Sequence, residues 1–161
     1  MIGGEMLLES VAMATAISAA VVAGIFFAFS TFVMRALRNL PAPQGIRAMQ
    51  QINITVLNPW FFSVFFGTAA GAMIVLGASI LDPTLPDAAG LATGSLAYLA
   101  GCILVTVFFN VPMNKALENK GPETEEGAVF WQRYLSRWTA WNHVRTGMSA
   151  VAAVCIFAAI N

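Results

Sequence analysis

The feature that most constrains this chain is a set of long apolar runs without charged residues. Residues 10–34 contain no Asp, Glu, Lys or Arg. Because a helix rises 1.5 Å per residue, roughly 20 apolar residues cross the hydrocarbon core of a bilayer. Charged residues make up only 10% of the chain, against about 25% in soluble domains. The sequence therefore predicts an all-α integral membrane protein whose surroundings are the lipid bilayer.

The apolar runs predict a polytopic membrane four-helix bundle in a single domain of residues 1–161. The predicted spans are residues 10–34, 59–80, 91–111 and 139–160. Residues 35–58 and 112–138 are predicted connectors, and residues 45–57 within the first connector are read as an interfacial helix or lead-in. Pro59 is expected to start or kink the second span, and Pro112 to disrupt the third near its end.

The basic residues predict the orientation of the bundle. All eight Lys and Arg lie in the two connectors or at the mouth of the last span, whereas the loop between the second and third spans holds only Asp82 and Asp87. The positive-inside rule makes the basic side cytoplasmic and places both termini on the other side. We expect a plasma membrane or a bacterial-type inner membrane.

Small residues recur four positions apart on the predicted spans, a spacing that lets helix backbones approach closely in lipid. The stripes are Ala20, Gly24 and Ala28; Gly67 and Gly71; Gly90 and Gly94; Ala97 and Gly101. They predict close packing and leave a homo-oligomer open. The zero net charge gives no indication of a nucleic-acid partner. One histidine and two distant cysteines predict no metal site.

Polar and aromatic residues collect at the predicted cytoplasmic ends of the spans, where ionisable groups are costly and indicate function. They are Asn58, Asn110, Asn114, Trp138, Trp141, Asn142, His143 and Arg145. At 100° per residue, His143 projects roughly 140° from Trp138, on a different face from Arg145. Two alternatives stay open: Trp138 as part of an aromatic belt, and Arg145 at the interface rather than in a buried pocket.

Several motifs resemble the anthrone-oxygenase-like family of small membrane proteins over about residues 11–153. They lie at residues 26–34, 49–53, 109–117 (with N-x-P-x-N) and 138–145 (W-x-x-W-N-x-x-R). The resemblance implies a four-helix membrane bundle. It also implies an activity, since the best-known fungal members of the family oxidise anthrones to anthraquinones with O2.

The chemistry of that reaction predicts roles for residues of the polar cluster. An anthrone methylene is acidic, and its enolate reacts with O2 directly, so the protein needs an aromatic slot, a base and a donor for the enolate oxygen. We expect Arg145 to stabilise the oxyanion with Asn142 beside it, and His143 is the only imidazole available as a base, although its face argues against that role. The predicted substrate-binding residues are Asn58, Asn110, Asn114, Trp138 and Trp141. No cofactor is predicted.

Other functions fit the same sequence. The pocket could bind a hydrophobic small molecule such as a quinone, a lipid or a haem without catalysis, and a haem could use His143 as its axial ligand. Alternatively, the polar cluster could serve only helix packing in a scaffold protein. The hydrophobic aromatic small molecule is therefore the predicted partner, with or without turnover.

Overall fold

The computed structural model describes residues 2–161, and every regular element in that range is helical. The elements are α1 (Ile2–Ala28), η1 (Phe29–Val33), α2 (Met34–Arg38), α3 (Ala42–Thr55), α4 (Pro59–Leu81), α5 (Ala88–Leu96), η2 (Ala97–Leu104), η3 (Thr106–Asn110), α6 (Val111–Glu118) and α7 (Glu125–Ala159). The segments labelled η are π-helical. The all-α prediction is confirmed.

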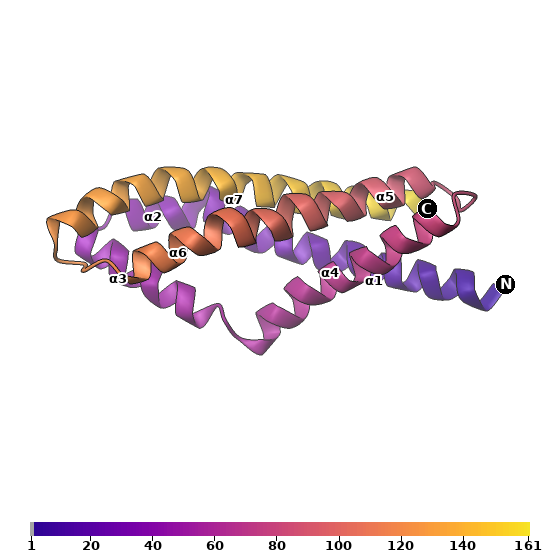
Figure 1. The fold of residues 1–161 in the computed structure, drawn as a ribbon, viewed down its shortest axis with the longest axis horizontal. Coiled ribbons are helices and arrows are strands. Elements are labelled where there is room, and N and C mark those ends of the chain that lie inside the picture. The colour runs from indigo at the N-terminus through magenta and orange to yellow at the C-terminus, as the bar shows by residue number, and fades with distance from the viewer. Residues whose placement is uncertain (1) are drawn as a thin grey trace.

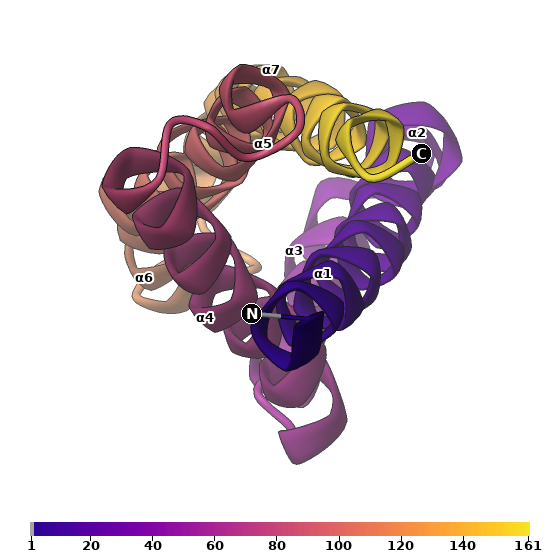
Figure 2. The same cartoon turned by 90° about the vertical axis from the view of Figure 1, so that its right-hand side faces the viewer.

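The helices join into long rods that run side by side (Figure 1). α1, η1 and α2 form the first rod, and α4 is the second. The stretch from α5 through η2 and η3 to α6 forms the third rod, and α7 is the fourth. Each of α1, α4, α5 and α7 contacts two of the others, in the cyclic order α1–α4–α5–α7 that the end view also shows (Figure 2). Both termini lie at one end of the molecule, and α2, α3 and α6 lie at the opposite end (Figure 1).

Three helical stretches among residues 2–161 are long and apolar enough to cross a membrane: Gly4–Arg38, Pro59–Leu81 and Ala88–Glu118. They contain the first three predicted spans. The predicted fourth span, residues 139–160, lies inside α7, but it does not reach the same hydropathy because Asn142, His143 and Arg145 occupy its first turns. The count of four spans and their orientation therefore stay predictions.

The connectors are more helical than the sequence predicted. The third rod continues through Pro112 to Glu118. Pro112 is the second residue after the π-helical turn of η3, and such widened turns are frequent sites of local irregularity and function. The lead-in at residues 129–138 is continuous with the last helix, since α7 starts at Glu125, where Thr124 accepts a hydrogen bond from the Gly127 amide at 3.0 Å.

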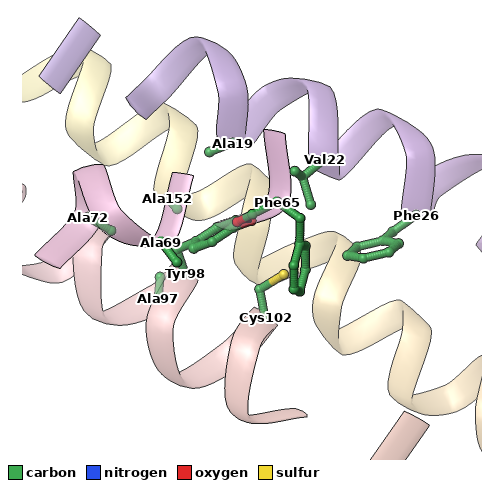
Figure 3. Close-up of a cluster of buried hydrophobic side chains, with 10 residues drawn as sticks. All are labelled: Ala19, Val22, Phe26, Phe65, Ala69, Ala72, Ala97, Tyr98, Cys102 and Ala152. Atoms are coloured by element: carbon green, nitrogen blue, oxygen red, sulfur yellow. Dashed lines mark hydrogen bonds between the residues drawn. The ribbon is translucent and has the colours of Figure 1, made fainter. Parts of the chain in front are cut away.

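The bundle is packed differently at its two ends. Near the termini the core consists of small and aliphatic side chains from α1, α4, α5 and α7. The middle adds aromatic rings, and Figure 3 shows Phe26 of α1 close to Phe65 of α4, with Tyr98 and Cys102 of η2 nearby. At the opposite end the core is dominated by Trp131, Tyr134 and Trp138 of α7.

The predicted small-residue stripes are only partly used within the chain. A Cβ added at Gly71 would meet the Thr15 side chain at 2.1 Å, and one added at Gly101 would meet Met148 at 2.4 Å, so these positions are close helix contacts. Gly24 and Gly67 have no neighbouring atom within 4 Å of an added Cβ among the described residues. The first stripe therefore does not pack against another helix at Gly24.

Candidate functional site

A cavity of about 200 Å³ lies at the aromatic end of the bundle, where α3 and α4 diverge from the third rod (Figure 1). Its wall takes residues from α1, η1, α3, α4, η2, η3, α6 and α7. Aromatic rings form much of that wall, among them Phe26, Phe29, Phe61, Phe65 and Trp138. The cavity is therefore suited to a flat, mostly apolar ligand.

Arg145 supplies the charge of this cavity. The residue is 5% exposed, and its guanidinium carbon lies 4.0 Å from the centre of the Phe26 ring and 5.1 Å from the Trp138 ring. One terminal nitrogen donates to Asn142 Oδ1 at 2.6 Å and the other to Thr106 Oγ1 at 3.3 Å. The Nε atom is buried and has no partner within residues 2–161.

No carboxylate balances that charge. None of the residues lining the cavity is Asp or Glu, and the ion pairs among the described residues are Arg47–Glu123 and Lys120–Glu126, both at the molecular surface. Two aromatic faces and two oxygen acceptors hold the guanidinium instead. An isolated buried cation attracts an anionic or strongly dipolar oxygen, so Arg145 gives the cavity a preference for such ligands.

Asn142 fixes Arg145 in place and ties α7 to the first rod. Its side chain is fully buried, and Nδ2 donates to the Phe26 carbonyl at 2.7 Å and to Ser30 Oγ at 2.8 Å. Its Oδ1 remains to accept from Arg145. Asn142 does not line the cavity, so it acts as a positioning residue.

Asn110 and Asn114 both face α7, as expected for residues four apart on one helix. Asn114 Oδ1 accepts hydrogen bonds from Tyr134 Oη at 2.8 Å and Trp138 Nε1 at 2.7 Å, and Asn110 Nδ2 donates to the Trp138 carbonyl at 3.2 Å. Burial raises the pKa of the Tyr134 phenol, which keeps it a neutral donor. These bonds fix the Trp138 ring at the wall.

The remaining predicted site residues lie elsewhere. Trp141 stacks on Phe109 with ring centres 3.7 Å apart and does not line the cavity. His143 is exposed on another face of α7. Asn58 caps α4, where its Oδ1 accepts from the Phe61 amide at 3.0 Å. Of the predicted residues, the structure therefore brings Arg145, Trp138 and Asn114 to the cavity wall, with Asn142 and Asn110 behind them.

The sequence analysis did not select Asn53 or Thr106, which also line the cavity. Asn53 ends one of the motifs at residues 49–53, so a signal was present. Its position in a predicted connector gave no reason to place it beside Arg145. Thr106 looks like an ordinary apolar-span residue until the contact with Arg145 is seen.

Comparison with known proteins gives one result. A family model described as anthrone oxygenase matches residues 60–155, from the start of α4 to the last turns of α7. No curated protein and no solved structure matches the chain. The matched region covers more than half of the chain and includes Thr106, Asn114, Trp138 and Arg145. The chain belongs to the anthrone oxygenase family.

Proposed function

We propose that this protein is a membrane-embedded oxygenase that oxidises an anthrone-type or related phenolic substrate with O2 in the cavity beside Arg145. The observation that carries the proposal is the buried guanidinium, which has aromatic and neutral polar neighbours but no carboxylate partner. Such a cation stabilises an oxyanion better than the same group does in water, because the protein supplies it already oriented and desolvated.

The reaction balances without a further reductant. Removal of one proton from the methylene gives an enolate whose negative charge rests on the ketone oxygen. The enolate gives one electron to O2, and the resulting carbon radical and superoxide combine to form a C–O bond. The peroxide then takes up a proton and loses water, including the second methylene hydrogen, to leave a second carbonyl. The net change is anthrone plus O2 to anthraquinone plus water.

Arg145 acts in the first step by lowering the pKa of the bound substrate. Its hydrogen bonds to Asn142 and Thr106 hold the guanidinium against the ring walls. No imidazole or carboxylate lines the cavity, and His143 is exposed on another face of α7. The proton is therefore taken by water or hydroxide, and turnover should rise with pH.

The surroundings of the cavity support delivery from a membrane. Apolar side chains that line it are also exposed at the molecular surface, among them Leu57, Phe66 and Val107. With α7 as the fourth span and the basic residues on the cytoplasmic side, the cavity lies near the cytoplasmic leaflet of a plasma or bacterial-type inner membrane. An apolar substrate dissolved in lipid then enters sideways.

A second candidate is a protein that binds a quinone or a lipid in this cavity without turning it over. The observation in its favour is that the cavity wall lacks an acid–base side chain among the described residues. A haem in this cavity would not have His143 as its axial ligand, because that side chain faces away from the cavity.

Oxygen uptake with anthrone, measured on protein in nanodiscs, tests the proposal. Arg145→Met should lower turnover by about 100-fold or more, as for the loss of an oxyanion donor. Arg137→Met is the matched control: Arg137 lies on the same helix but is exposed, so its loss should leave turnover within about twofold. Unchanged turnover in Arg145→Met would reject the proposed role. Tight binding without oxygen uptake would favour the second candidate.

A further inference from the structure

Two buried nitrogen atoms on residues lining the cavity have no hydrogen-bond partner within residues 2–161. One is Arg145 Nε and the other is Asn53 Nδ2. They come from different elements, α7 and α3. Buried polar atoms in folded proteins almost always have a partner, so each unpaired one requires an explanation, and a ligand is one such explanation.

The polar side chains of Thr106 and Asn114 at the wall are already paired. Thr106 Oγ1 donates to the Cys102 carbonyl at 2.8 Å and accepts from Arg145. Asn114 Oδ1 accepts two hydrogen bonds, from Tyr134 and Trp138. The buried unpaired atoms on the wall residues are therefore both nitrogen donors, and the ligand they fit carries oxygen acceptors at two places.

The neighbour of Asn53 does not account for its free amide. The Tyr134 phenol faces Asn53, but its hydrogen goes to Asn114. Burial raises the pKa of that phenol and the Asn53 side chain beside its oxygen lowers it, but their contact does not have hydrogen-bond geometry, so Nδ2 has no partner among the described residues. Asn53 also has no acidic side chain beside it among the residues lining the cavity.

We propose that Asn53 is a second binding residue that donates a hydrogen bond to the oxygen that oxidation adds, while Arg145 holds the oxygen already present. This rests on the proposed function for the ring system and for the reaction. It predicts that the site prefers a ring with two carbonyl oxygens over the same ring with one. The product would then bind more tightly than the substrate, and Asn53 would set the strength of product inhibition.

Anthrone and anthraquinone are a matched pair for the test, because they share one ring system and differ in the second carbonyl. Their dissociation constants would be measured on the full-length protein in nanodiscs, without O2 for anthrone. The variants are Asn53→Leu, which removes the amide, and Asn53→Asp, which keeps its shape but presents acceptors only. Gln51→Leu is the control, because Gln51 is exposed on the same helix and its Nε2 donates to Thr55 Oγ1 at 3.2 Å.

The expected result is a wild-type preference for anthraquinone of about tenfold, the size of one well-placed hydrogen bond. Asn53→Leu should abolish this preference and leave the affinity for anthrone unchanged. Asn53→Asp should lower the affinity for anthraquinone further. In steady-state assays of Asn53→Leu, KM for anthrone should equal that of the wild type, while the inhibition constant for the product should be about tenfold higher. Gln51→Leu should resemble the wild type.

Two results would overturn the inference: an unchanged anthraquinone preference in both Asn53 variants, or an equal loss of affinity for both ligands, which marks a structural role. If Asn53→Leu does not fold, Asn53→Asp decides. Failure of the oxygenase proposal is separate. The wild-type protein could take up no oxygen and still prefer anthraquinone. If the Asn53 substitutions then abolish that preference, the inference about Asn53 stands and the oxygenase proposal fails.

Discussion

The two ends of the bundle use different means to hold four rods together. Near the termini, backbones approach closely: a Cβ added at Gly94 of α5 would lie 2.7 Å from the Ile156 side chain and 3.0 Å from the Ala152 carbonyl of α7. At the other end, Trp131, Tyr134 and Trp138 stack in sequence along α7, with ring centres 5.6 and 5.8 Å apart. Large rings fill the core between the helices there.

This difference explains why the cavity lined by aromatic rings and Arg145 lies at the end opposite the termini. A larger hollow of about 410 Å³ near the termini is lined by aliphatic and polar residues such as Leu8, Glu9 and Asp82. Alanine and glycine contacts bring helix backbones close together, and their stability comes from van der Waals contact over a long interface. The rings are held by a few hydrogen bonds that they donate to residues such as Asn114, and they leave a space that Arg145 faces. We infer that one end chiefly supports stability and the other chiefly supports binding, and the following predictions test that division.

The largest effect is expected where the two roles meet, at Asn142. Asn142→Leu removes two hydrogen bonds to the first rod and the bond that orients Arg145. We expect a loss of about 2–4 kcal/mol in the free energy of unfolding, because several buried polar groups lose their partner together. Turnover should fall by at least about tenfold. Thermal unfolding in detergent and oxygen uptake measure the two effects.

Ser149→Ala is the control for that substitution. Ser149 is also fully buried on α7, but its Oγ has no hydrogen-bond partner among the described residues. Its removal should change stability by less than about 1 kcal/mol. If Asn142→Leu were as harmless as Ser149→Ala, the link between α7 and the first rod would not depend on this amide.

A smaller effect is expected at the closely packed end. Gly94→Ala must separate α5 from α7, because one of its close neighbours is a backbone carbonyl that cannot rotate away. The expected cost is about 1–3 kcal/mol of stability, with ligand affinity unchanged. Gly77→Ala is the control, because an added Cβ there meets no described atom within 4 Å. A change in anthrone affinity in Gly94→Ala would break the division between the two ends.

The helical rods could be predicted from the sequence because charge-free apolar runs have few other ways to fold. The charge-free run of residues 10–34 sets the first span, and the turn at residues 82–87 is marked by its prolines and acidic residues. The ends of the helices were harder. Pro112 looks like a helix end in sequence, yet the rod continues to Glu118 because η3 supplies a widened turn just before it.

The candidate site was predictable where it lies on one helix. The spacing of Trp138, Asn142 and Arg145 places them on one face of α7, and the same angular argument placed His143 elsewhere. Contacts between rods were out of reach. Nothing in the sequence shows that α3 folds back toward Arg145, so Asn53 was read as part of a connector. Trp141, which shares the face of Trp138 on a helical wheel, instead stacks on Phe109 of a neighbouring rod.

The smallest effect is expected in the loop between α4 and α5, at the end opposite the Arg145 cavity. Hydrogen bonds from the Thr84 hydroxyl and the Thr84 amide lower the pKa of Asp82. A carboxylate whose pKa is lower in the folded protein stabilises the fold at pH values above its pKa in the unfolded chain, which is near 4. This stability is lost as the pH falls through the pKa of the folded protein. Thr84→Val removes the hydroxyl, so it should be slightly less stable than the wild type at about pH 6 and equal to it well below the folded pKa. Melting temperatures across this range measure the difference.

A difference that persists in acid would mean that Thr84 stabilises the turn by packing rather than through the Asp82 charge. Because Asp82 is far from the cavity, anthrone turnover at about pH 6 should be the same in both proteins, and a change in turnover would show that the two ends are coupled.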